Sequence, residues 1–144
     1  MRTLVVAAVC GLVCLGDAPR TVTLTATEDM KFQKHEITAN AGEELHVVLT
    51  AVGRMPKAAM AHNFVLVKSG TDVERFTAAA FNARDTGFIP PEMAGAVIAH
   101  TDLAGAGETV DVTFTAPVTP GRYVFFCSFP GHYELGMRGL LTVK

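Results

Sequence analysis

Hydrophobic and polar residues alternate along several short segments of this chain. Residues 21–27 alternate Thr with Val22, Leu24 and Ala26, and residues 45–50 alternate in the same way. A period of two places the apolar side chains on one face of a β-strand. The sequence predicts further strands over 60–67, 97–101, 110–114, 123–127 and 140–144. Short strands separated by turns at this spacing predict an all-β fold, a Greek-key β-sandwich.

Two segments depart from this alternation. The apolar parity changes between Phe32 and Ile37, so we expect a bulge or kink near residues 33–34. In residues 71–81, Thr71 and Glu74 have the spacing of a capping box, and Val73, Phe76, Ala80 and Phe81 recur at helical intervals. We therefore expect one short amphipathic helix, which forms a flap against the sandwich.

The first residues have the pattern of a secretory signal. Arg2 precedes about a dozen mostly apolar residues, too few to span a bilayer as a helix. We expect residues 1–18 to be a signal peptide, cut after Ala18 in preference to Gly16, and residues 19–144 to be one mature domain. A lipid anchor on Cys10 or Cys14 is the alternative, although valine precedes each cysteine where a small residue is expected.

Composition narrows the possible functions. The net charge of −2 provides no basic field for nucleic acid, so nucleic-acid binding is not expected. The hydrophobic content of 49% in 144 residues is enough for a single buried core. Removal of the signal would leave Cys127 as the one thiol in an oxidising compartment, and a metal would explain such a cysteine.

The strongest chemical pattern lies near the C-terminus. Cys127, His132 and Met137 fall within eleven residues, separated by Pro130 and glycines that allow the backbone to fold back. Thiolate, imidazole and thioether are soft ligands that suit copper or zinc better than calcium or magnesium. Two imidazoles, one thiolate and a weak thioether form the blue-copper arrangement, so a second histidine is required.

His62 is the candidate for that second histidine. It lies in an apolar run, and three longer segments carry a resemblance to a known family: Met60-Ala61-His62-Asn63, Val97-Ile98-Ala99-His100-Thr101 and Phe125-Phe126-Cys127-Ser128-Phe129-Pro130-Gly131-His132. From about Asp29 to Lys144 the chain resembles the azurins and auracyanins of the cupredoxin family. His35, His46 and His100 are expected to be surface histidines.

The resemblance implies a copper cofactor, one type 1 copper per chain, held by His62, Cys127, His132 and Met137. It also implies that the backbone amides of Asn63 and Phe129 donate hydrogen bonds to the Cys127 sulfur. The Asn63 side chain is expected to tie the two ligand segments together.

Two departures from the azurin pattern affect the site. Ala61 stands where azurins have a glycine whose carbonyl approaches the copper, and the resemblance implies a weak metal contact from the Ala61 backbone carbonyl. One additional residue separates His132 from the methionine ligand, as in auracyanins. Around His132, the resemblance implies an apolar docking patch at the point where the imidazole reaches the surface, made of Met60, Phe129, Pro130, Gly131 and Leu135.

The resulting expectation is a periplasmic electron carrier that shuttles single electrons and is not an enzyme. Its partners would be redox proteins such as c-type cytochromes or copper/haem oxidoreductases, which dock transiently on a monomer with no membrane span in the mature chain. The alternative is a copper-storage or delivery protein without an electron-transfer role. Zinc could occupy the same ligands. A copper enzyme would need further histidine sites, typically His-x-His pairs, which this sequence lacks.

Overall fold

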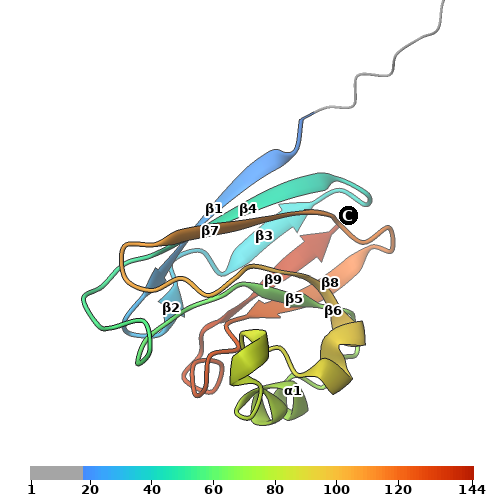
Figure 1. Cartoon of the computed structure of the whole chain (residues 1–144). Coiled ribbons are helices and arrows are strands. Elements are labelled where there is room, and N and C mark those ends of the chain that lie inside the picture. The colour runs from blue at the N-terminus through green and yellow to red at the C-terminus, as the bar shows by residue number, and fades with distance from the viewer. Residues whose placement is uncertain (1–17) are drawn as a thin grey trace, which may run out of the picture.

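The computed structural model describes residues 18–144, which form two β-sheets that face each other, with the helices on the outer side of one sheet (Figure 1). The expected signal peptide lies outside the described residues, apart from Ala18. The first sheet has four strands in the order β2-β1-β4-β7, namely Lys31–Phe32, Arg20–Thr27, Glu44–Ala51 and Thr109–Thr115. The second has five strands in the order β3-β9-β8-β5-β6, namely Glu36–Ala39, Arg138–Val143, Gly121–Phe126, Val65–Val67 and Val97–His100.

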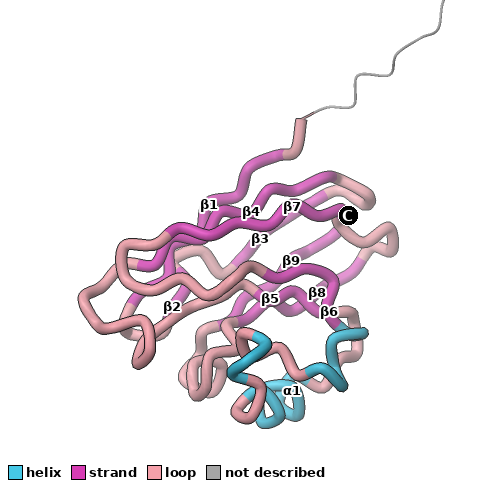
Figure 2. Tube along the Cα trace, viewed as in Figure 1, coloured by secondary structure: helices cyan, strands magenta, loops and turns pink. Residues whose placement is uncertain are grey.

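The pairing of the strands confirms the expected all-β Greek-key sandwich. Strand β1 runs parallel to β4 and β3 runs parallel to β9, whereas the other pairs are antiparallel. Figure 2 shows that loops join the helices to one another and to the neighbouring strands. No helix within residues 18–144 is both long and apolar enough to cross a membrane.

The parity change between Phe32 and Ile37 has a topological cause. Strand β2 belongs to the first sheet, and after three connecting residues the chain enters the second sheet as β3. Phe32 and Ile37 therefore both face the same core, from opposite sheets, with 5% of each exposed. The expected kink is a crossing from one sheet to the other.

The main core fills the space between the sheets. Phe125 lies at its centre, with ring centroids 5.6 Å from Phe32 and 5.2 Å from Phe64. Complete burial of one such side chain contributes roughly 1.5–3 kcal/mol. Cys127 follows the end of this strand two residues after Phe125 and belongs to the same buried cluster, so this core also fixes where the thiol points.

The helical flap consists of α1 (Val73–Ala80) and two short 3₁₀ helices, η1 (Arg84–Thr86) and η2 (Pro91–Ala96). Phe76 of α1 packs against Phe126 of β8, with ring centroids 5.3 Å apart, in a second cluster on the outer side of the five-stranded sheet. The flap thus covers the strand that leads to Cys127.

Two details of the predicted helix are wrong. The N-cap is Asp72, whose carboxylate accepts a hydrogen bond from the Arg75 amide at 3.0 Å, while the Thr71 hydroxyl donates back to the Lys68 carbonyl. Phe81 is 65% exposed because it follows the last helical residue and points away from the sheet. Spacing alone could not distinguish two adjacent capping residues.

Candidate metal centre

The candidate ligands come from two connections at one end of the sandwich. Cys127 directly follows β8, and His132 and Met137 lie in the loop between β8 and β9. His62 precedes β5, where its backbone forms an isolated bridge with Ala104 through hydrogen bonds of 2.9 and 2.8 Å. The strand expected over 60–67 is therefore shorter and begins at Val65, although residues 61–67 are all buried.

The structure brings the predicted histidines and cysteine together. One ligand atom each from His62, Cys127 and His132 lies within 4.8 Å of the others. The Cys127 sulfur is 3.4 Å from Nδ1 of His132, and the two imidazole rings are 4.9 Å apart. The nitrogen and sulfur atoms of residues up to 70 positions apart in the sequence thus lie close enough together to bind one ion.

The cluster is closed off from solvent. Cys127 and Met137 are 0% exposed, and His62 and His132 are 2% and 3% exposed. Nδ1 of His62 is buried and has no hydrogen-bond partner among the described residues. A buried polar atom without a partner is costly, and it is satisfied if it coordinates an ion. The donor set and this unpaired nitrogen fit a soft metal such as copper.

Burial also sets the protonation of these side chains. It lowers the pKa of His62, and it lowers the pKa of His132 to about 4, with an added contribution from the neighbouring His62. Burial raises the pKa of the Cys127 thiol to about 12. At neutral pH both imidazoles are therefore neutral and can offer lone pairs, whereas the thiol must lose a proton when a metal binds.

The loop from Cys127 to Met137 is closed by its own backbone. Gly131 and Gly136 adopt φ of +84° and +96°, values that residues other than glycine rarely adopt. The Met137 amide donates to the His132 carbonyl at 2.9 Å, and the Cys127 amide donates to the Met137 carbonyl at 3.1 Å. These bonds hold the thioether-bearing residue beside both other ligands of the loop.

Asn63 links the two segments that carry the ligands. Its Oδ1 accepts from the Ser128 amide at 2.8 Å, and its Nδ2 donates to the Ser128 hydroxyl at 2.9 Å. Backbone hydrogen bonds from Asn63 and Phe129 to the Cys127 sulfur act against the increase in the thiol pKa, so both amides point at the sulfur. The carbonyl oxygen of Ala61 lies 4.0 Å from the same sulfur.

The structure also places the residues of the expected docking patch. Met60, Phe129, Pro130 and Gly131 are half-buried, and Leu135 is 56% exposed. The Phe129 ring lies 4.8 Å from the His132 ring. The surrounding loop leaves only 3% of His132 exposed, so at most a small part of its imidazole reaches the surface at the expected patch.

Several contacts of the site were not predicted. Gly87 of the flap accepts from Asn63 Nδ2 at 3.3 Å, and the Thr77 hydroxyl of α1 donates to the Glu134 carboxylate at 2.8 Å. Thr101 accepts from the Phe64 amide at 3.0 Å. Only Thr101 had a sequence signal, since it ends one of the three family-like segments, whereas the flap contacts depend on tertiary packing.

The remaining histidines are at or near the surface, as expected. His35 and His100 are exposed, and the half-buried His46 lies 2.9 Å from the Asp111 carboxylate. Among residues 18–144, the cluster of His62, Cys127 and His132 is the only group of three or more such side chains placed to hold an ion.

A buried set of two imidazoles, a thiol and a thioether at one end of a Greek-key sandwich defines a blue-copper protein. Comparison with known proteins gives the same class: residues 20–144 match the copper binding proteins of the plastocyanin/azurin family. The chain belongs to this family, and its cofactor is copper.

The chain is similar to both auracyanins and azurins. It is 47% identical over 83 residues to auracyanin-B of Chloroflexus aurantiacus, covering 57% of this chain and 35% of that protein. It is 38% identical over 126 residues to azurin of Pseudomonas chlororaphis, covering 85% of this chain and 97% of that protein. The match thus spans about a third of the length of auracyanin-B but nearly all of this azurin.

A solved structure shares the fold. Auracyanin A, a "blue" copper protein from Chloroflexus aurantiacus, superposes with a TM-score of 0.76 and 33% sequence identity, covering 88% of this chain and all of that one. These comparisons confirm the resemblance to the azurins and auracyanins of the cupredoxin family.

Proposed function

We propose that this protein is a periplasmic electron carrier that shuttles single electrons between redox proteins through a type 1 copper site. The observation that carries the proposal is the buried cluster in which ligand atoms of His62, Cys127 and His132 lie within 4.8 Å of one another. Copper bound there supplies reversible one-electron chemistry. The protein supplies the ligands, the dry surroundings and the fixed geometry.

Each ligand has a distinct role in the proposal. Cys127 binds as a thiolate, His62 binds through its unpaired Nδ1, and His132 binds through the Nδ1 that faces the sulfur. Met137 would offer its thioether as a weak additional ligand, which fits its complete burial at the end of the loop. Because buried imidazoles are already neutral, only the thiol has to release a proton.

The residues next to the ligands keep the site rigid. We assign the amides of Asn63 and Phe129 as donors to the sulfur, and the Asn63 side chain as the link that fixes one ligand segment against the other. The Ala61 carbonyl is assigned as a weak additional contact. Ligands held by a packed frame need little rearrangement when the charge of the ion changes, which favours fast electron exchange.

Partners would approach over the apolar patch of Met60, Phe129, Pro130, Gly131 and Leu135. The adjacent rings of Phe129 and His132, 4.8 Å apart and tilted by 39°, provide a short path from the patch to the buried site. A patch without charged side chains favours brief encounters over long-lived complexes. We propose c-type cytochromes or copper/haem oxidoreductases as partners of a monomer, with residues 1–18 directing export and 19–144 forming the working domain.

Electron transfer explains the site better than storage or catalysis. Within the described part of the chain, one enclosed cluster can hold one ion, whereas storage would benefit from several accessible sites. All four ligands are at most 3% exposed. A substrate would therefore have no open position at the ion to which it could bind.

Spectroscopy tests the proposal directly. One equivalent of Cu(II) added to the purified protein should give an intense blue absorption band and narrow copper hyperfine splitting. Ascorbate should bleach the band and an oxidant should restore it. A pale spectrum with ordinary hyperfine splitting, or a colour that ascorbate does not bleach, would reject the carrier in favour of storage or delivery.

A further inference from the structure

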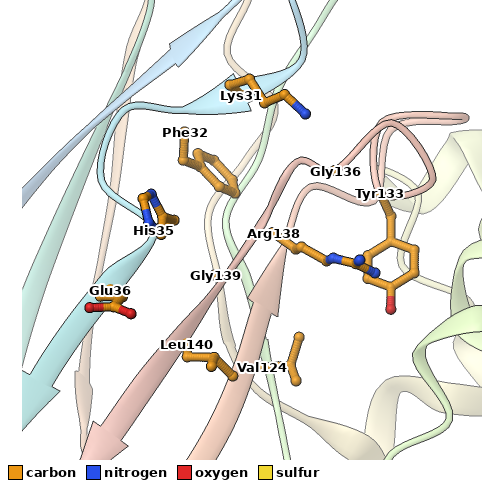
Figure 3. A pocket seen from close by; sticks show the side chains of 10 residues that line it. All are labelled: Lys31, Phe32, His35, Glu36, Val124, Tyr133, Gly136, Arg138, Gly139 and Leu140. Atoms are coloured by element: carbon orange, nitrogen blue, oxygen red, sulfur yellow. The ribbon is translucent and has the colours of Figure 1, made fainter.

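A groove of about 650 Å³ lies beside the metal centre but contains none of its ligands. Its walls come from β2, β3, β8, β9 and the loop that precedes β9 (Figure 3). Tyr133 and Gly136 of its lining belong to the segment between His132 and Met137. The groove is therefore a separate feature that shares one wall with the ligand loop.

The lining combines apolar surface with positive charge. Phe32, Val124, Tyr133 and Leu140 provide aromatic and aliphatic surface, and Lys31 and Arg138 are the two permanently cationic side chains. A concave apolar surface with a few polar groups, in the volume range of roughly 300–1,000 Å³, is typical of small-molecule sites. The groove has the size and character to hold a small amphipathic molecule.

Neither cation forms a salt bridge with a carboxylate of residues 18–144, although Asp29 lies near enough to Lys31 for the charge of the lysine to help lower the Asp29 pKa. Lys31 Nζ donates to the Leu135 carbonyl, and the Arg138 guanidinium lies 5.0 Å from the centre of the Tyr133 ring. The ion pairs found among residues 18–144 involve other bases, namely Arg20, His46 and Lys57. Both cations thus retain hydrogen-bonding capacity for an anion.

The one carboxylate of the lining lies away from Lys31. In Figure 3, Lys31 and Glu36 stand at opposite ends of one wall, with Phe32 and His35 between them. The Arg138 side chain extends across the groove toward Tyr133, above Leu140 and Val124. Lys31 therefore lies apart from the negative group, which is opposite Leu140 in the register of β3 and β9.

We propose that this groove binds a small carboxylate with an apolar body, such as a medium-chain fatty acid. The carboxylate pairs with Lys31 and Arg138, whose guanidinium can donate two parallel hydrogen bonds to it. The aliphatic body covers Leu140, Val124 and the Tyr133 ring. Both parts are needed, because an exposed ion pair alone contributes little and an apolar body alone leaves the cations unpaired.

Occupancy of the groove would act on the ligand loop. An anion that attracts Lys31 competes with the Leu135 carbonyl, and one that attracts Arg138 changes its contact with Tyr133. Both contacts restrain the segment that positions Met137. This coupling rests on the proposed copper site, but binding in the groove does not, so the two can be tested separately.

Octanoate titrated into the isotope-labelled, metal-free protein tests the binding itself. The amides of Gly136 and Gly139, which line the groove, should shift in the nuclear magnetic resonance spectrum, and the shifts should saturate. Octanol and acetate should bind at least about tenfold more weakly, since each lacks one half of the recognition. Octylammonium binding as tightly as octanoate, or octanoate shifting no groove amide at millimolar concentration, would overturn the proposal.

Substitutions test whether Lys31 and Arg138 bind the carboxylate of the ligand. Lys31→Gln and Arg138→Gln should each weaken octanoate binding about tenfold, whereas Lys31→Arg should remain within about twofold. Arg122→Gln is the matched control, because Arg122 is an exposed cation on β8 outside the groove lining. If Arg122→Gln weakened octanoate binding equally, the effect would come from the net charge of the protein, and the proposed carboxylate site at Lys31 and Arg138 would be rejected. A shift in the copper absorption band on saturation would then report the coupling.

Discussion

The side-chain amide of Asn63 holds Ser128 at two points, accepting from its backbone amide at 2.8 Å and donating to its hydroxyl at 2.9 Å. Both residues are about 1% exposed, so water cannot replace these bonds. Asn63 follows His62 and Ser128 follows Cys127 in the sequence. One buried side chain thus joins the two segments that carry the ligands.

Replacement of Asn63 by alanine should destabilise the metal-free protein by roughly 2–4 kcal/mol. The change removes the bonds to Ser128 and the bond to the Gly87 carbonyl, and it leaves the Ser128 amide buried without a partner. Urea unfolding measures the effect. Asn82→Ala, at an exposed position, is the control and should stay within about 0.5 kcal/mol of the parent protein. An equal loss of stability in the two variants would show that the Asn63 hydrogen bonds have no special role.

Substitution of the sulfur ligands should separate their roles. Cys127→Ser should abolish the intense blue band, because that band requires the thiolate. Met137→Leu should leave a blue protein with a changed reduction potential, since a buried thioether of similar volume is replaced by an apolar group. Absorption spectra and redox titration give the two results. A strong charge-transfer band in Cys127→Ser would show that the assigned thiolate is wrong.

Gly139 of β9 lies close to the His35 backbone and the Phe125 ring. A Cβ at this position would come within 2.5 Å of the His35 carbonyl oxygen and would overlap the Phe125 ring. Gly139→Ala should therefore cost at least about 2 kcal/mol, because a backbone atom cannot easily move away. In thermal unfolding, Gly95→Ala should match the parent protein, as no atom lies within 4 Å of its Cβ position. An unaffected Gly139→Ala protein would contradict this packing.

The stability of the metal-free protein should depend on pH in both directions. The pKa of His132 falls from 6.5 to about 4 on folding, so the unfolded chain binds the extra proton and stability declines as pH falls from about 6.5 toward 4. The pKa of Cys127 rises from 9.0 to about 12, so stability declines as pH rises above 9. The two shifts correspond to at most roughly 3–4 kcal/mol each.

Urea unfolding across this pH range measures both limbs. Cys127→Ser should lose part of the alkaline decline and keep the acid decline, because only the thiol is removed. An alkaline decline that is the same in the parent and in Cys127→Ser would show that the thiol does not contribute.

The docking patch should control the rate of electron exchange. Leu135→Gln should slow reduction by a c-type cytochrome about tenfold, equivalent to about 1.4 kcal/mol of encounter free energy, because it removes the most exposed apolar side chain of the patch. Stopped-flow absorption measures the rate. Val118→Gln is the control, since Val118 is 77% exposed before the opposite end of β8. Equal rates in all three proteins would place the docking surface elsewhere.

The sequence by itself determined the sandwich and the donor set. Alternating residues such as Val22 and Leu24 select one buried face, and that pattern is local, so it can be recognised without tertiary information. The spacing of Cys127, His132 and Met137 is also local, and only the pairing with His62 needed the family resemblance. The limits of β5 and the identity of the α1 cap were wrong because competing local patterns differ by little free energy.

Only the tertiary structure decided how the chain is arranged around that site. The loop covers His132, and residues 32–36 cross from one sheet to the other. Thr77 and Gly87 of the flap form hydrogen bonds with the ligand segments. The tertiary structure also created the groove beside Lys31 and Arg138 from segments about 100 residues apart. Such contacts depend on how two sheets and a flap pack together, and no local pattern in the sequence encodes that packing.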